Sequence, residues 1–204
     1  MSAGAARAQE RVSSEAATAE QRLAEDVGLE RLRGALPQST VREAQNTAEL
    51  LQIGVGNNAV LDQRNLATLG NQAYITQAGA VNVLELVQQG SDNRTYLNQQ
   101  GYDNRASFRQ DGQGNSSTLS QRGAGNKLTG LVDGDGNQVN VRQDGYSNQV
   151  KSEIHQDGRT YNINQIGYNN TLTQLESAAQ AAKGYSIEMR GSGINITIEQ
   201  GKIR

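Results

Sequence analysis

Residues 93–114 read Asn93-Arg-Thr-Tyr-Leu-Asn-Gln-Gln-Gly101-Tyr-Asp-Asn104-Arg-Ala-Ser-Phe-Arg-Gln-Asp-Gly112-Gln-Gly114, which is one eleven-residue pattern written twice. Each unit has Asn in its first place, a small or apolar residue in its third and fifth places, Gln in its seventh and Gly in its ninth. A fixed internal period of this kind is the signature of a repeat architecture. The fold is therefore expected to be an array of similar units, one for each repeat.

The pattern continues on both sides of this stretch. Its Asn returns every eleven residues at Asn71, Asn82, Asn93, Asn104, Asn115, Asn126, Asn137 and Asn148. Its Gln stands at Gln77, Gln88, Gln99, Gln110, Gln121, Gln143 and Gln165, and its Gly at Gly79, Gly90, Gly101, Gly112, Gly123, Gly134 and Gly145. Further units start at Asn46, Asn57 and Asn170, with three residues inserted between the units of Asn57 and Asn71. A disordered chain of biased composition does not keep such a register.

The spacing predicts a strand in each unit. Side chains alternate between the two faces of a strand, so the first, third, fifth and seventh places share one face. Glycine accepts a positive φ angle, which suits the start of a tight turn after the strand. Each unit is therefore expected to form a strand of about six residues followed by a turn.

Two units that face each other can bury the shared face, so 22 residues are expected to form one flattened coil. Coils stacked in parallel at about 4.8 Å would give an all-β, two-strand-per-turn β-solenoid with cross-β geometry. Residues 46–204 hold about seven such coils. The buried Asn and Gln would form ladders, because each side-chain amide can donate to one neighbour and accept from another. We interpret these residues as the self-assembly ladder, and the Gly residues as the turns.

The chain divides into two predicted parts. Residues 1–45 carry no repeat and are interpreted as a polar leader, disordered or helical. Residues 46–204 form the repeat array, which becomes irregular from residue 149 and contains an Ala-rich insertion at 177–182. The first residues contain no apolar signal segment, so a signal peptide is expected to be absent or truncated.

Composition removes several classes of function. There is no Cys, so disulfide and thiolate chemistry are excluded, and the single His rules out a multi-His metal site or a His-based triad within one chain. A net charge of −2 provides no basic field for nucleic acid. We expect no enzyme activity, no catalytic residue, no cofactor, no metal and no small-molecule substrate.

Three groups of residues have a second interpretation. Asp133-Gly-Asp135-Gly-Asn137 begins like a calcium loop, but Gln138 and Asp144 stand where that loop needs Gly and Glu, so a turn is favoured. His155 falls on an outward place and could sense pH. The tyrosines in the fourth and tenth places could make lateral contacts between fibres or bind a matrix; they are Tyr74, Tyr96, Tyr102, Tyr146 and Tyr168.

The stretches Gln99-Gln-Gly101-Tyr-Asp-Asn104-Arg-Ala106 and Asn71-Gln-Ala-Tyr-Ile-Thr-Gln-Ala-Gly79 resemble the repeat of the curli proteins. Curli subunits are secreted bacterial proteins that polymerise into the amyloid fibres of biofilm matrix. The resemblance implies an extracellular fibre subunit that partners itself, a nucleator or major subunit, and an outer-membrane secretion channel. The end from Met189-Arg190 to Lys202-Ile-Arg204 is similar to the last repeat of the minor, nucleating subunit, so a nucleator is one alternative. A monomeric solenoid that acts as an adhesin or binds ice is the other, although the outward places lack the regular Thr row of ice-binding solenoids.

Overall fold

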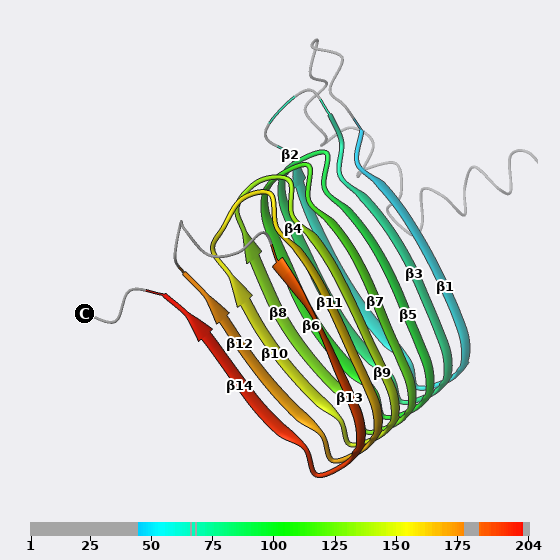
Figure 1. Ribbon diagram of the computed structural model, residues 1–204. Coiled ribbons are helices and arrows are strands. Elements are labelled where there is room, and N and C mark those ends of the chain that lie inside the picture. The colour runs from blue at the N-terminus through cyan, green and yellow to red at the C-terminus, as the bar shows by residue number, and fades with distance from the viewer. Residues whose placement is uncertain (1–44, 66, 68, 178–183, 202–204) are drawn as a thin grey trace, which may run out of the picture. The chain divides into compact units, whose positions relative to one another are not determined.

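The computed structural model describes residues 45–65, 67, 69–177 and 184–201, and these residues form fourteen strands in two sheets (Figure 1). One sheet contains β1 (Thr47–Val55), β3 (Gln72–Ala80), β5 (Arg94–Tyr102), β7 (Ser116–Ala124), β9 (Gln138–Tyr146), β11 (Thr160–Tyr168) and β13 (Gly184–Ser192). The other contains β2 (Asn58–Asn65), β4 (Val83–Ser91), β6 (Arg105–Gln113), β8 (Lys127–Asp133), β10 (Gln149–Ile154), β12 (Thr171–Glu176) and β14 (Asn195–Gln200).

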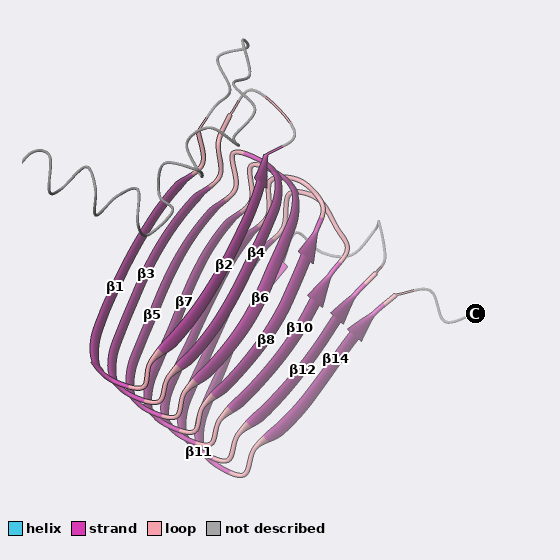
Figure 2. Ribbon diagram, turned by 180° about the vertical axis from the view of Figure 1, so that it is seen from behind, coloured by secondary structure: helices cyan, strands magenta, loops and turns pink. Residues whose placement is uncertain are grey.

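The chain alternates between the sheets, so each odd-numbered strand and the even-numbered strand after it make one coil. All neighbouring strands pair in parallel, as Thr95↔Ser117 and Leu84↔Ala106 illustrate. The two sheets are seen one behind the other in Figures 1 and 2. Paired residues are 22 apart in most of the array and 25 apart between the first two coils, because the three inserted residues lie there. The predicted two-strand β-solenoid of about seven coils is confirmed.

The core lies between the two sheets and follows the predicted alternation. In β5, residues at the third, fifth and seventh places of the unit are buried while their neighbours are exposed. The apolar core is thin and contains mainly Ala, Val, Leu and Ile. Phe108 fits because the residue paired with it one coil later is Gly130, whose missing Cβ would lie 2.4 Å from the Phe108 ring.

The strands are longer than the sequence pattern predicts. Most span nine residues and continue through the Gly of the ninth place, so the chain pairs beyond the expected start of the turn. Gly101, for example, has φ +119 inside β5, and a second residue with positive φ, Asp103, follows two places later. The glycine bends the end of the strand, and the actual turn lies in the last places of the unit.

Some sequence predictions concern residues outside those that the structure describes. Only Gln45 of the predicted leader and Ser177 of the predicted Ala-rich insertion are described. From residue 149, where the repeat becomes irregular, β10 still pairs in register with β8 and β12. No helix within the described ranges has the length and hydropathy of a membrane span.

Candidate functional site: the amide ladders and the solenoid ends

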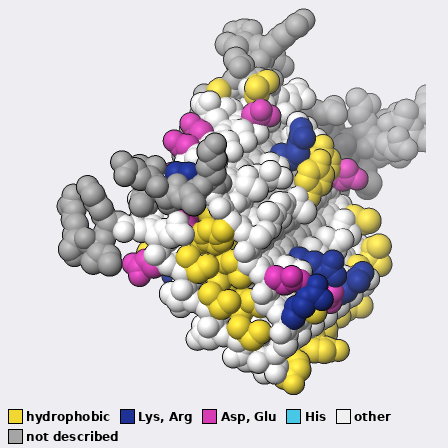
Figure 3. All heavy atoms as spheres, viewed as in Figure 1, with side chains coloured by type: hydrophobic (Ala, Val, Ile, Leu, Met, Phe, Trp, Pro, Cys, Tyr) yellow, Lys and Arg dark blue, Asp and Glu magenta, His cyan; other side chains and the backbone are white. Residues whose placement is uncertain are grey.

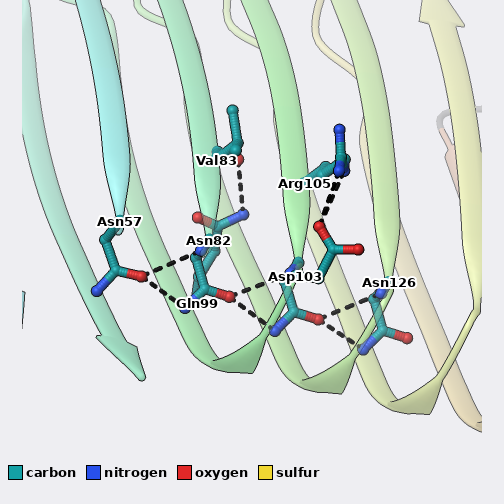
Figure 4. A network of polar contacts seen from close by, with 8 residues as sticks. Asn57, Asn82, Val83, Gln99, Asp103, Arg105 and Asn126 are labelled. Atoms are coloured by element: carbon teal, nitrogen blue, oxygen red, sulfur yellow. Dashed lines mark hydrogen bonds and ion pairs between the residues drawn. The ribbon is translucent and has the colours of Figure 1, made fainter. Parts of the chain in front are cut away.

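Two columns of asparagines run along the solenoid, one in each sheet. Asn71, Asn93, Asn115 and Asn137 precede the odd-numbered strands, whereas Asn82, Asn104, Asn126 and Asn148 precede the even-numbered ones. All eight are at most 1 % exposed. Figure 4 shows the second column from Asn57 through Asn82 to Asn126.

Each asparagine oxygen is an acceptor for the next coil. Asn82 Oδ1 accepts hydrogen bonds from both the backbone N–H and the Nδ2 of Asn104, each over 3.1 Å. The same pair of contacts joins Asn93 to Asn71 and Asn126 to Asn104. The donor always belongs to the later coil and points toward the N-terminal end of the solenoid.

The other hydrogen of most asparagine amides bonds to the carbonyl oxygen of a ninth-place glycine 19 residues later, whereas Asn137 donates to Gln156 O. Asn82 Nδ2 donates to the Gly101 carbonyl oxygen over 3.1 Å, and Asn104 Nδ2 donates to that of Gly123 over 3.0 Å. The asparagine therefore fixes the bend that the ninth-place glycine makes in the following coil, in addition to forming the ladder.

The glutamines form a second type of ladder. In the sheet of β1, Gln77, Gln99, Gln121, Gln143 and Gln165 continue a column that starts at Gln52, with Nε2 to Oε1 distances of 2.6–2.9 Å. Each Nε2 donates to the later coil, so this ladder runs in the opposite direction to the asparagine ladder. The second N–H of the glutamine amide donates to a backbone carbonyl oxygen of the facing sheet, as Gln99 Nε2 does to Val83 O over 3.1 Å (Figure 4).

The glutamine column of the other sheet is short. Gln63 donates to Gln88 over 2.8 Å and Gln88 to Gln110 over 2.9 Å. The next coils carry Val132, Ile154 and Glu176 at this place, and the last coil carries Gln200. The sequence pattern joins all these glutamines into one set, whereas the structure divides them between two sheets.

A buried polar cluster occupies the last coils, and sequence reasoning did not identify it. Glu176 is fully buried, and Tyr185 OH donates to its Oε1 over 2.5 Å. Glu176 Oε2, Tyr161 OH and Gln174 Nε2 are buried without a hydrogen-bond partner. Burial, followed by the Glu176 charge, raises the pKa of Tyr161 to about 12. Burial and the hydrogen bond to Glu176 also raise the pKa of Tyr185.

The first coil leaves its inward face exposed at the end of the solenoid. Leu50 in β1 is paired with the buried Ile75 in the next coil, yet it is 49 % exposed because no described coil precedes it. The outward residues Leu51, Ile53 and Val55 of the same strand are also exposed. Hydrophobic side chains gather along this edge in Figure 3. Among the described residues, the outermost strands β1, β2, β13 and β14 pair on one side only, and an unpaired strand edge can pair with another chain.

The residues with a second interpretation make local contacts. Asp135 Oδ1 accepts the backbone N–H of Gln113 over 2.7 Å, and Asp133 Oδ2 lies 3.1 Å from His155 Nδ1. The described residues contain no group of three or more Asp, Glu, His or Cys side chains that could hold a metal ion.

The five tyrosines of the fourth and tenth places lie on the outer surface. Tyr74 and Tyr96 stack with their ring centroids 4.9 Å apart, beside an outer groove of about 420 Å³. Tyr102, Tyr146 and Tyr168 are exposed. None of the five is part of the solenoid core.

Comparison with known proteins agrees with the geometry. Residues 90–123 match the family model of the curlin-associated repeat, and this segment contains β5, β6 and most of β7. No curated protein and no solved structure gives a significant match to the chain. The matched segment pairs in the same parallel register as the coils on either side of it. The solenoid therefore contains a segment that is similar to the curlin-associated repeat.

Proposed function

We propose that this chain is a structural subunit of an extracellular, curli-like amyloid fibre that grows by end-to-end stacking of solenoids. The observation that carries the proposal is the exposed first coil, where an inward face, the column-forming Gln52 and Gln63, and two strand edges end in solvent. Another coil stacked there would continue the same parallel pairing. The biological role would be structural, in biofilm matrix and adhesion, after secretion through an outer-membrane channel.

The interior of the solenoid supports this proposal on energetic grounds. Stacking buries the apolar strip at about 25 cal/mol for each Å² of apolar surface removed from water. It also adds ladder hydrogen bonds of roughly 1 kcal/mol each. Stacked identical amides and parallel strands are the elements of cross-β fibres.

A curli-type nucleator is the second candidate. It is favoured by the last coil, in which Met189 and Ile194 stand where earlier coils carry Gln and Asn. A nucleator needs one end that templates other subunits, whereas a main fibre subunit needs two ends that fit each other.

The test of end-to-end stacking is a charge placed at the inward face of the first coil. Leu50→Lys would leave the ammonium in solvent in the monomer but bury it without a partner in a stack, at a cost of several kcal/mol. We expect wild-type protein, freed of denaturant, to form fibres with 4.7–4.8 Å cross-β diffraction. The Leu50→Lys protein should remain soluble over the same period, as measured by sedimentation and electron microscopy.

Leu51→Lys is the matched control. Leu51 adjoins Leu50 in β1 and is 50 % exposed, compared with 49 % for Leu50, but it faces outward and would stay in solvent in a stack. This variant should form fibres like the wild type. A wild-type chain that stays monomeric for days at high concentration would contradict growth by copies of this chain alone. If it also fails to join fibres of another curlin-repeat chain, stacking is wrong and a monomeric adhesin or ice-binding solenoid is favoured.

A further inference from the structure

The two ends of the solenoid carry different residues at the ladder places. The first coil carries amides at all four ladder places, namely Asn46, Gln52, Asn57 and Gln63. In the last coil three of these places are described, and they hold Met189, Ile194 and Gln200. The columns are complete at the N-terminal end and interrupted at the C-terminal end.

The directions of the ladder hydrogen bonds determine which donors and acceptors a coil stacked before the first coil must present. Gln ladders donate toward the later coil, so a preceding coil must offer Nε2 groups to Gln52 Oε1 and Gln63 Oε1. No described residue donates to either oxygen. Asn ladders accept from the later coil, so the preceding coil must also offer an Oδ1 to the backbone N–H of Asn57, as Asn82 does for Asn104.

The last coil of a second copy meets these requirements only in part. Continuing the register would place Gln200 over Gln63, where its Nε2 can donate. It would place Met189 over Gln52, and Met has no donor; Met189 already ends its column, because its Sδ accepts from Gln165 Nε2 at 3.4 Å. Ile194 would lie over Asn57 and has no side-chain acceptor.

The outward residues of such a junction also match poorly. In the same register, Glu199 of β14 would lie beside Asp62 of β2, and like charges on adjacent strands repel. Glu188 and Arg190 of β13, which are ion-paired with each other, would lie beside the apolar Leu51 and Ile53. Only the apolar strip continues well, with Ile187 over Leu50 and Ile198 over Leu61.

The same interruptions are tolerated inside the chain for a separate reason. Val132 and Ile154 break a Gln column, yet β8 and β10 still pair, since covalent linkage makes their stacking intramolecular. A junction between two molecules lacks that advantage. At such a junction, each amide that is buried without a hydrogen-bond partner makes the free energy of association less favourable.

From these contacts we propose that the C-terminal coil is a built-in terminator of stacking, in that it raises the concentration at which copies of this chain join end to end. The partner that fits the N-terminal coil is then the end coil of a different curlin-repeat chain, one with Gln and Asn at the places of Met189 and Ile194. The proposal rests on the proposed stacking function and names its partner. It makes the N-terminal end the one through which the chain joins a fibre.

The experiment restores the missing amides in the full-length chain with the double substitution Met189→Gln and Ile194→Asn. The critical concentration for association is measured by sedimentation, and dimer formation by analytical ultracentrifugation. Each restored position should lower the critical concentration by about tenfold. Sonicated seeds of this variant should also capture wild-type monomers more efficiently than wild-type seeds do.

The matched control is Ser186→Gln with Thr197→Asn, which adds the same residue types to the same strands on their outward places. It should change the critical concentration by less than about twofold, and circular dichroism should show that both variants keep the wild-type strand content.

Each result has one meaning. If wild-type and restored proteins polymerise equally well, the terminator is wrong and the stacking function stands. If only the restored protein polymerises, the terminator is supported and homopolymer growth of the wild type is wrong. If neither associates by either method, both proposals fail.

Discussion

The ninth-place glycines pack against one another along the axis more closely than any other residue allows. A Cβ added to Gly101 would lie 2.0 Å from the Gly123 carbonyl oxygen, which is the atom that Asn104 Nδ2 binds. Gly114, in the eleventh place, also has a positive φ, but nothing lies within 4 Å of its added Cβ. The two types of glycine are therefore needed for different reasons, close approach in one case and backbone conformation in the other.

This difference predicts unequal costs for one substitution. Gly101→Ala should lower the free energy of unfolding by roughly 3 kcal/mol or more, because both the backbone strain and the stacking of the next coil oppose it. Gly114→Ala should cost about 1–2 kcal/mol, from backbone strain alone. Urea denaturation of the monomeric solenoid measures both values. Equal costs would show that close approach along the axis is not a constraint.

At the scale of the strand, β12 carries the least favourable core residue. Glu176 stands in the seventh place of its unit, where most units carry Gln, and its buried carboxylate has one hydrogen bond and one oxygen without a partner. A glutamine there could keep the hydrogen bond from Tyr185 and could direct an amide toward Gln200, its paired residue in β14.

Glu176→Gln is therefore expected to stabilise the solenoid by about 1–3 kcal/mol, since it removes a buried charge and supplies a donor for the column. Thermal unfolding at neutral pH is the measurement. Glu153→Gln in β10, on the outward face, serves as the control and should have an effect within about 0.5 kcal/mol. A loss of stability in the Glu176 variant would mean that the carboxylate is needed by the Tyr185 hydroxyl.

Much of this architecture could be predicted from the period alone. The strands, their parallel order and the buried columns follow from the eleven-residue spacing, because strand alternation determines which places share a face. Glu176 could also have been found, since it falls on a ladder place of the unit that starts at Asn170.

Other features depend on geometry that spacing does not contain. The bond from Asn82 Nδ2 to the Gly101 carbonyl crosses between coils at an offset of 19 residues, and it depends on how the strand bends after its seventh place. The pattern also cannot tell in which direction each ladder donates. That choice depends on the side-chain rotamers in the assembled core.

For the solenoid as a whole, each coil contacts only its neighbours, so its stability varies along the axis. The last coils contain the buried polar cluster and the interrupted columns, and they should open first. Tyr161 provides a way to observe this opening.

Its pKa is raised to about 12 in the folded chain, whereas an unfolded tyrosine ionises near 10. The contribution of Tyr161 to stability is then complete below about pH 10 and is lost as pH rises toward 12, because only the unfolded state ionises in that window. We expect the C-terminal coils to lose roughly 1–3 kcal/mol over this range. In Tyr161→Phe this part of the pH dependence should disappear from unfolding curves, and an unchanged slope would contradict the assignment.

The opposite directions of the two ladders have an electrical consequence. Aligned amide dipoles add up along an α-helix and leave partial charges at its ends. In this solenoid the Gln-to-Gln bonds donate toward the C-terminal coil and the Asn-to-Asn bonds donate toward the N-terminal coil, so the axial dipoles of these bonds oppose each other. The backbone dipoles of strands alternate and largely cancel as well. A coil with one ladder of each direction therefore adds less to a dipole along the axis than a coil with two ladders of the same direction would.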